Sequence, residues 1–363
     1  RHQFLRESMM SSSSPQQIVA GVEGGGTTWV CALALASEPS VLLERASFAT
    51  TEDPSVTLGQ VKAWLDERTF DALGIASFGP IDPKRESKTY GYITQTPKPG
   101  WAYADVVGSL GGKNTTDKVP TAFDTDVNAP AFAESQKDPG KDIAYVTVGT
   151  GVGVGLVVNG KPVHGFLHPE AGHLAAPRHP GDDGFDATGL TMLACPDWNE
   201  VEAHVASRAL VRRAGLSDAS ELKDLDDDHP VWDAAAHYLA VTCAQLLLAV
   251  SPEKIVLSGG IMQRDSLFPK IRRKVLTYLN GYVPNLDEDT AEKLIVPSRW
   301  RNDAGIIGAL FLATTKLPTK NNKIDDEGVR EKKKAFLLGC AVGCAFAGAT
   351  LFGLVLMSSK RKY

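Results

Sequence analysis

The sequence has few cysteines, no excess of positive charge and no secretory signal. Its five cysteines form an odd, scattered set, which argues against a disulfide framework and favours a reducing compartment: Cys31, Cys195, Cys243, Cys340 and Cys344. The formal net charge of −5 at pH 7 provides no broad basic surface, so we expect no nucleic-acid partner. Residues 1–17 lack the apolar core of a signal peptide, and we expect them to form a disordered leader.

One carboxylate, Asp126, follows directly after a predicted strand. Residues 119–123 form an apolar run that predicts a strand, and residues 127–134 predict a helix. Asp126 therefore lies at a strand-to-helix junction, beside the free amides of the helix start, where side chains often meet ligands. The alternative is that Asp126 only caps the helix.

Two glycine-rich turns have no bulky side chains that would keep a phosphate away. They are Gly24-Gly25-Gly26-Thr27, at the tip of a predicted hairpin, and Gly149-Thr150-Gly151-Val152-Gly153. The first is not a P-loop, because no Gly-Lys-Ser/Thr sequence follows it and no helix is entered. With Asp126 the two turns indicate phosphoryl transfer, although plain hairpin turns are the alternative. Glu23 could hold Mg²⁺ through water, or it could be a solvated strand residue.

A loop rich in proline and aromatic residues spans residues 90–101. It follows three predicted strands, a helix and a buried strand that ends in Ser77-Phe78-Gly79-Pro80-Ile81-Asp82. The loop has no strand or helix periodicity, which predicts plain surface turns. Its length and its Thr, Lys and Trp side chains also suit the wall of a pocket for a polyhydroxylated ligand.

Seven motifs in order resemble the ROK family of sugar kinases, and two of them resemble its fructokinase branch in particular. The two branch motifs are Thr-Pro-Lys-Pro-Gly-Trp at residues 96–101 and His-Pro-Glu-Ala-Gly-His at residues 168–173. The resemblance covers about residues 18–315, and its other motifs are Gly24 to Thr27, Ser77 to Asp82, Thr125 to Asn128, Gly149 to Gly153 and Leu257 to Gly260.

This resemblance implies an α/β protein with the two-lobed, actin-like (ribonuclease H-like) ATPase fold. Residues 18–130 would form the N-terminal kinase lobe and residues 131–315 the C-terminal lobe, with ATP and Mg²⁺ in the cleft between them. Asp126 matches the family's general base, which takes the proton from the sugar hydroxyl as that hydroxyl attacks the γ-phosphate. The residues that match nucleotide and phosphate contacts are Gly25, Gly26, Thr27, Thr150, Gly151, Gly153, Gly259 and Gly260. Those that match sugar contacts are Gly79, Thr125, Glu170, His173 and Glu202.

The chain departs from the family pattern after the first turn. Thr28 stands where the family usually carries lysine. Losing a cation beside the phosphates should weaken nucleotide binding or turnover, unless Lys98 or another base compensates.

A second departure concerns a structural zinc site. In the family, the histidine that matches His173 is followed by a short Cys/His cluster that closes this site, but here only Cys195 clearly remains. His173 and Cys195 are candidate zinc ligands, and Asp197, Glu200 or His204 could replace the lost ones. One histidine and one cysteine do not complete a tetrahedral site. The alternative is a metal-free loop packed by the side chains of Leu190, Met192, Leu193 and Trp198.

The composition changes after the kinase-like region. Residues 316–334 are rich in Lys, Asn, Asp and Glu, which predicts an exposed linker. Residues 335–357 are uncharged, and a helix of that length at about 1.5 Å per residue extends about 35 Å, enough to cross a hydrocarbon core of about 30 Å. A buried core helix is the alternative, but the fold is already complete without it. We therefore predict a transmembrane anchor over residues 335–357.

The predicted anchor also predicts a location. A span so near the C-terminus inserts after translation, so we expect a tail-anchored protein whose kinase lobes face the cytosol, on a membrane that the sequence does not identify. Gly339 and Gly343 form a small-residue face through which two anchors could pair, which would give a homodimer.

Taken together, these features predict an ATP-dependent, Mg²⁺-requiring hexose kinase that converts D-fructose to fructose 6-phosphate. Mannokinase and glucokinase activities are the alternatives within the same class. From another class, the chain could be a membrane-tethered sugar or nucleotide sensor with impaired catalysis, as Thr28 and the eroded zinc loop suggest. Retention of Asp126 argues against the sensor.

Overall fold

The computed structural model describes residues 16–111, 119–190 and 198–318. The chain divides into two compact units, Arg1–Lys316 and Leu317–Tyr363, and the first contains nearly all of the described residues. Nearly all of the predicted leader, most of the predicted linker and the whole predicted transmembrane segment lie outside them.

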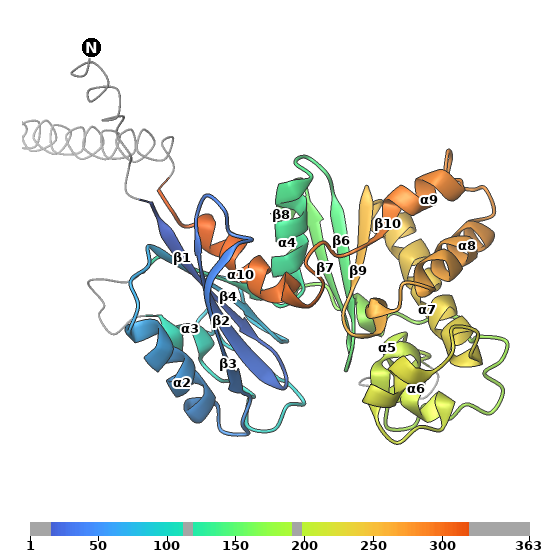
Figure 1. Cartoon of the computed structure of the whole chain (residues 1–363), viewed down its shortest axis with the longest axis horizontal. Helices are drawn as coiled ribbons and strands as arrows, with labels where there is room; N and C mark the ends of the chain where they lie inside the picture. Colours follow the sequence, from blue (N-terminus) through green and yellow to red (C-terminus); the bar gives the residue numbers. More distant parts are fainter. Residues whose placement is uncertain (1–15, 112–118, 191–197, 319–363) are drawn as a thin grey trace, which may run out of the picture. The chain divides into compact units, whose positions relative to one another are not determined.

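The N-terminal lobe is built on a five-stranded mixed sheet in the order β3-β2-β1-β4-β5 (Figure 1). The antiparallel strands are β1 (Ile18–Gly24), β2 (Thr28–Leu35) and β3 (Leu42–Ala49), and β4 (Ala72–Ser77) and β5 (Thr121–Thr125) run parallel to β1. α2 (Pro54–Asp66) packs on β2 and β3, and α3 (Val106–Leu110) packs beside α2. The carboxylate of Asp53 accepts from Ser55 N and starts α2, and Pro54 occupies the first turn, as the sequence rules for helix starts require.

The C-terminal lobe has a second five-stranded sheet in the order β10-β9-β6-β7-β8. Its strands are β6 (Ile143–Val148), β7 (Val152–Val158), β8 (Lys161–Pro162), β9 (Lys254–Ser258) and β10 (Ile295–Pro297). Its α-helices are α4 (Asn128–Lys137), α5 (Glu202–Val205), α6 (Ser207–Ala214), α7 (Pro230–Val250), α8 (Leu267–Leu279) and α9 (Glu288–Leu294). Short 3₁₀ turns are η1 (Ala171–His173), η2 (Ala219–Asp224), η3 (Ile261–Gln263) and η4 (Arg301–Asp303).

Helix α10 (Ala304–Thr314) returns the chain to the first sheet. It packs against β1, β4 and α4 (Figure 1). The approach is close: a Cβ added at Gly74 would lie 1.8 Å from Ala309 O. The predicted division of the chain after residue 130 assigned α10 to the second lobe, whereas its buried apolar face covers the first sheet.

Two other elements differ from the sequence expectation. The helical spacing of apolar residues predicts one helix near residues 201–214, but the structure breaks it into α5 and α6 at Ala206, whose backbone is extended (ψ 154°). The break lets Ser207 N donate to Gly149 O at 2.7 Å. Trp101 was expected either in plain surface turns or in a pocket wall. It is instead fully buried in the first core, with its ring stacked on Trp29 at a centroid distance of 5.3 Å.

Among the described residues, α7 is the one helix long and apolar enough to span a bilayer. Most of this helix is buried within the protein, where it contacts α8, α5 and α6. Its length and composition are those of a core helix in this lobe.

Candidate functional site

The strand register brings three predicted motifs to one edge of the first sheet. Gly24 is the register partner of Ser77 in the parallel β1/β4 pair, and Ser77 is the partner of Thr125 in the β4/β5 pair. Phe78 N donates to Gly24 O at 2.8 Å, and Asp126 N donates to Ser77 O at 3.0 Å. The first glycine turn, the Phe78-Gly79 segment and Asp126 therefore leave the sheet side by side.

Asp126 does not cap the helix that follows it. The N-cap of α4 is Val127, and this helix start has no side-chain cap. Instead, Asn128 N donates to the hydroxyl of Thr125 at 2.9 Å. Burial raises the pKa of Asp126 to about 7, and the negative charge of Glu170 adds to this effect. The carboxylate is thus available as a base near neutral pH.

A buried polar cluster lies next to Asp126 along the chain. Asp124 Oδ1 accepts from Asn128 Nδ2 and pairs with His164 Nε2, both at 3.0 Å. Asn128 Oδ1 accepts from Leu156 N of β7 at 3.1 Å, so this amide links the end of β5 to the second sheet. Sequence reasoning missed the cluster, because the Asp-Thr-Asp-Val-Asn spacing does not reveal which side chains turn inward.

The predicted sugar contact Thr125 is almost completely buried, and its hydroxyl is used by Asn128 N. In this structure Thr125 orients the start of α4. A direct contact between Thr125 and a sugar stays a prediction.

The first glycine turn forms the tip of the β1/β2 hairpin. Gly25 N donates to Thr28 O at 2.9 Å and closes the turn, and Thr50 Oγ1 donates to Gly25 O at 2.8 Å. Gly26 and Thr27 are exposed, and a Cβ at Gly26 would meet no atom within 4 Å. The tip therefore presents an open backbone, as phosphate binding requires.

The second glycine turn and the Gly259-Gly260 turn leave one edge of the second sheet. Thr147 of β6 is the register partner of Ser258 of the parallel strand β9. Gly259 has a φ of +91°, and a Cβ there would lie 2.4 Å from Val148 O, so only glycine lets the two turns approach so closely.

Glycine is also needed within the second turn. A Cβ at Gly151 would lie 2.6 Å from Glu202 Oε2, and one at Gly153 would lie 2.7 Å from Val127 Cγ1. These two predicted phosphate-side residues are therefore fixed by the packing around them.

A cavity of about 760 Å³ lies between these turns and helices of the second lobe. It includes two predicted nucleotide contacts, Thr150 and Gly260, and is also lined by Trp232 and Arg264. The guanidinium of Arg264 lies 4.3 Å from the centre of the Trp232 ring and donates to Leu225 O at 2.9 Å. The cavity is large enough for a nucleoside, and it adjoins the two turns that suit phosphates.

Glu23 is half-buried rather than solvated. Burial raises its pKa to about 7, and the charge of Asp126 raises it further, while Arg45 lowers it. A Cβ at Gly305 of α10 would lie 2.0 Å from Glu23 Oε1, so this glycine makes room for the carboxylate. Two half-buried carboxylates that repel each other beside the two glycine turns fit a divalent cation. Arg45, whose charge acts on Glu23, forms an ion pair with Asp303 at 2.6 Å.

The structure brings the predicted sugar contacts Glu170, His173 and Glu202 into one region with Asp126. Glu170 Oε2 lies 4.0 Å from His173 Nε2. Burial raises the pKa of Glu170, with His173 opposing and Glu202 adding to the shift. Glu202 Oε2 accepts from Val152 N at 2.8 Å, so this carboxylate also supports the second glycine turn.

His168, to which sequence reasoning gave no separate role, joins the two lobes at this place. Its Nε2 accepts from Ile81 N at 3.1 Å, and a Cβ at Gly79 would lie 3.3 Å from its ring. Burial lowers the pKa of His168, which keeps the ring neutral and able to accept. The predicted sugar contact Gly79 is thus held against the loop that carries Glu170.

The predicted zinc site is not supported. Cys195 and Asp197 lie outside the described residues, and within the described residues no group of three or more His, Cys, Asp or Glu side chains could hold a metal. His173 Nδ1 lies 3.1 Å from Glu200 Oε2.

His204, considered above as a replacement ligand, belongs to a buried polar network. Its Nδ1 lies 3.3 Å from Asp182 Oδ2, and its Nε2 lies 2.5 Å from Asn199 Oδ1. Arg213 forms a bidentate ion pair with Asp182, and the hydroxyl of Tyr238 donates a hydrogen bond to the same carboxylate. This network ties the long loop before residue 190 to α6 and α7 without a metal.

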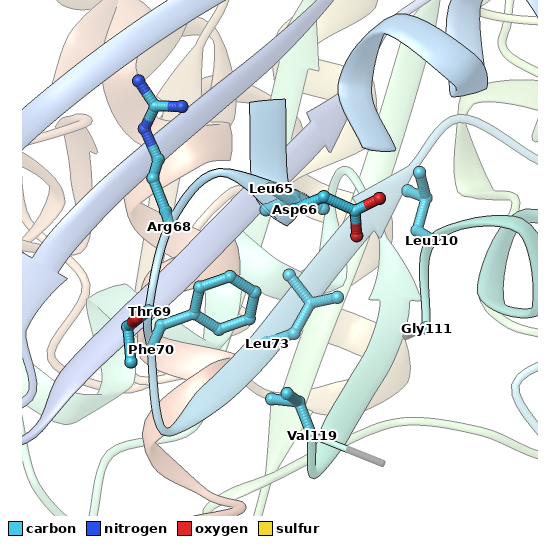
Figure 2. Close-up of a pocket in the computed structure, with 9 residues that line it drawn as sticks. All are labelled: Leu65, Asp66, Arg68, Thr69, Phe70, Leu73, Leu110, Gly111 and Val119. Carbon is cyan, nitrogen blue, oxygen red and sulfur yellow. The ribbon is translucent and has the colours of Figure 1, made fainter. Parts of the chain in front are cut away.

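Another cavity, of about 260 Å³, lies at the opposite end of the first sheet. Figure 2 shows its lining by Leu65, Leu73, Leu110 and Val119. Leu73 is near the amino end of β4, whereas Asp126 follows the carboxyl end of the neighbouring parallel strand, so this cavity is remote from the site.

Comparisons with known proteins agree with this geometry. The sequence model of the ROK family matches residues 19–316. A fructokinase from Pediococcus pentosaceus is 38% identical over 307 residues, which cover 83% of this chain and 99% of that protein. A putative fructokinase from Bacillus subtilis (strain 168) is 36% identical over 301 residues, with coverage of 82% and 95%.

Solved structures share the fold. A ROK hexokinase from Thermus thermophilus has a TM-score of 0.63 at 22% identity, covering 82% of this chain and 98% of that one. A ROK family glucokinase from Streptomyces griseus, in complex with glucose and AMPPNP, has a TM-score of 0.62 at 20% identity, with coverage of 82% and 99%. The predicted two-lobed, actin-like α/β fold is confirmed, and the chain belongs to the ROK family.

Proposed function

We propose that this protein is a fructokinase, which uses ATP to convert D-fructose to fructose 6-phosphate. Fructokinases from Pediococcus pentosaceus, Lactococcus lactis and Zymomonas mobilis are 34–38% identical over 80–83% of the chain. The observation that carries the proposal is the position of Asp126. Its half-buried carboxylate does not cap α4, and it lies between the first glycine turn and the Glu170–His173 pair.

Asp126 acts as the general base. With a pKa of about 7, the carboxylate is about half ionised at neutral pH, and its ionised form is basic enough to accept the proton of the sugar hydroxyl. The deprotonating hydroxyl oxygen forms a bond to the γ-phosphorus of ATP, and the bond from that phosphorus to the bridging oxygen of ADP breaks. The transferred proton ends on Asp126.

The nucleotide occupies the cavity of about 760 Å³, with its phosphates directed toward the two glycine turns. Open backbone at Gly26 and the tight turns around Gly151 and Gly259 allow close approach of phosphate oxygens. Mg²⁺, when bound near Glu23 and Asp126, would neutralise charge on the β- and γ-phosphates.

The sugar binds beside Asp126, against Glu170 and His173, with Glu202 next to them. A carboxylate that accepts from two hydroxyls discriminates among hexoses, because a sugar with one hydroxyl misplaced leaves a polar group unpaired. This is the reason to test mannose and glucose beside fructose.

ADP release by the purified protein, with ATP and Mg²⁺, tests the proposal on a panel of fructose, mannose, glucose and N-acetyl sugars. We expect fructose to give the highest kcat/KM and Asp126→Asn to lower turnover by about 10²–10⁴-fold while nucleotide still binds. The matched control is Asp228→Asn, at an exposed aspartate of a loop. If turnover were highest on glucose or mannose, that sugar would replace fructose as the proposed substrate. If the folded protein bound nucleotide but turned over no sugar, the sensor function would be favoured.

We further propose that residues 335–357 attach the kinase to a membrane and that its lobes face the cytosol. Support comes from the uncharged composition of this segment, and from Cys31 and Cys243, which are buried and free as in a reducing compartment. Carbonate extraction of membranes from cells that express the chain, with and without residues 335–357, tests the attachment. Loss of the membrane-bound fraction on deletion is expected, and equal solubility of both forms would refute it. Cross-linking in the same membranes tests whether the anchors pair.

A further inference from the structure

Glu200 is a fully buried carboxylate that faces a predicted sugar-binding side chain. None of its surface is exposed, and its Oε2 lies 3.1 Å from Nδ1 of His173. The other ring nitrogen, Nε2, lies 4.0 Å from Glu170 Oε2. The imidazole of His173 is therefore held between a carboxylate in the interior and a carboxylate of the sugar pocket.

The backbone places Glu200 and His173 together independently of any ligand. Glu200 forms an antiparallel bridge with Ala175, two residues after His173. The indole Nε1 of Trp198 donates to the carbonyl oxygen of His173 at 2.7 Å. Two short segments, residues 173–176 and 198–201, are thus paired along their main chains, which fixes the separation of the two side chains.

The contact sets the hydrogen on the ring. A carboxylate oxygen accepts, so Nδ1 of His173 donates to Glu200, and in the neutral ring Nε2 then carries no hydrogen. An unprotonated Nε2 beside Glu170 can accept from a sugar hydroxyl. Without Glu200 the ring could rotate or change tautomer, and Nε2 would lose this defined role.

The described residues do not fit the zinc ion that the family resemblance implied. Nδ1 of His173 is used by Glu200, and Nε2 faces Glu170 at 4.0 Å. A metal at Nε2 would lack the other ligands of a tetrahedral site, because the described residues offer no cluster of three or more His, Cys, Asp or Glu side chains.

We propose that Glu200 is a positioning residue for sugar recognition, which fixes the orientation and tautomer of His173 by a direct hydrogen bond where the family uses a metal site. This inference rests on the proposed sugar kinase function. It predicts that Glu200 affects the binding of the sugar and does not affect the binding of the nucleotide.

The test uses the full chain and compares Glu200→Ala and Glu200→Gln with an exposed control, Glu38→Gln. We expect Glu200→Ala to raise KM for fructose about tenfold, the loss of one oriented hydrogen bond, with KM for ATP unchanged. Glu200→Gln keeps an acceptor oxygen and should restore most of the sugar affinity. An equal change in KM for fructose and for ATP would indicate only a loss of structure and overturn the proposal.

A second readout does not depend on activity. In protein labelled with ¹⁵N-histidine, we expect His173 to show the Nδ1–H tautomer in the wild type and to lose it in Glu200→Ala. Zinc analysis of the same sample should find no zinc bound through His173. The opposite tautomer, or one zinc per chain that His173→Ala removes, would overturn the proposal. If the wild type turns over no sugar, the proposed kinase function fails. The ¹⁵N spectrum still shows whether Nδ1 of His173 donates to Glu200, because that readout does not need activity.

Discussion

The backbone N–H of Asp126 donates a hydrogen bond of 3.0 Å to the carbonyl oxygen of Ser77. This bond extends the β4/β5 ladder by one residue beyond the last strand pair, Ser77–Thr125. The backbone of Asp126 is therefore fixed at the edge of a sheet, and its position does not depend on a loop.

Replacing the carboxylate of Asp126 should slow phosphoryl transfer and leave nucleotide binding unchanged. We expect Asp126→Asn to lower kcat by about 10²–10⁴-fold, the range typical for a positioned acid or base. Isothermal titration should give an unchanged Kd for nucleotide. A fall in kcat below tenfold would contradict the role of Asp126.

The same substitution should stabilise the fold at higher pH. The pKa of Asp126 is raised from 3.8 to about 7 in the folded protein, so its contribution to stability is present below 3.8 and lost as pH rises through 7. An Asn side chain carries no charge at any pH, so the variant does not lose stability in this way as pH rises. At pH 8 we expect Asp126→Asn to have a higher Tm than the wild type, by about 2–4 °C for each kcal/mol gained in the free energy of unfolding. At pH 4 we expect no such difference.

Activity should depend on the ionisation of Asp126. At low fructose concentration and saturating ATP, kcat/KM should rise as pH rises through about 7, because only the ionised carboxylate accepts a proton. The negative charge of Glu170 raises the pKa of Asp126, so Glu170→Gln should move the midpoint to lower pH, even though sugar affinity falls. A midpoint that stays in place or moves upward would show that another group controls the profile.

Asn128 should be needed for both stability and turnover. It is fully buried, donates to Asp124 and accepts from Leu156 N. Asn128→Ala leaves these groups short of partners, at a cost of about 2–3 kcal/mol, and also loosens Asp126. Thermal unfolding and kcat measure the two effects, and the exposed Asn302→Ala is the control. Unchanged Tm in Asn128→Ala would show that water replaces the amide.

The contact between β4 and α10 can be tested with a pair of glycine substitutions. A Cβ at Gly74 would lie 1.8 Å from Ala309 O, so Gly74→Ala must push sheet and helix apart. We expect a loss of about 3 kcal/mol or more in the free energy of unfolding. Gly59 lies in α2 with no atom within 4 Å of an added Cβ, so Gly59→Ala should gain about 0.5–1 kcal/mol. Urea unfolding of both variants decides the matter, and similar midpoints would contradict the close approach.

The sequence predicts the strands and helices well where a single period dominates. The buried strand predicted to end at Ser77 is β4 in the structure, and it ends at that residue. It could not predict the break at Ala206, because the helical pattern of apolar residues continues across it. The break depends on a distant partner, the carbonyl of Gly149.

The candidate site shows the same division. Asp126 and the glycine turns were identified from local pattern and family resemblance, since each lies at the end of a strand. The Glu200–His173 contact joins positions 27 residues apart and needs the backbone pairing around Ala175, which no local pattern reveals. Trp101 was assigned to a pocket because large aromatic side chains suit both ligands and cores, and only packing distinguishes the two.

The return of α10 to the first sheet has a consequence for how the chain folds. One face of β1 and β4 is covered by residues 304–314, so the N-terminal lobe cannot close its core until almost the whole kinase has been synthesised. During translation this apolar surface stays uncovered until α10 has been made, and it is then a binding site for chaperones. A chain cut before residue 304 would lose the stability of its first lobe although every residue of the sheet remained.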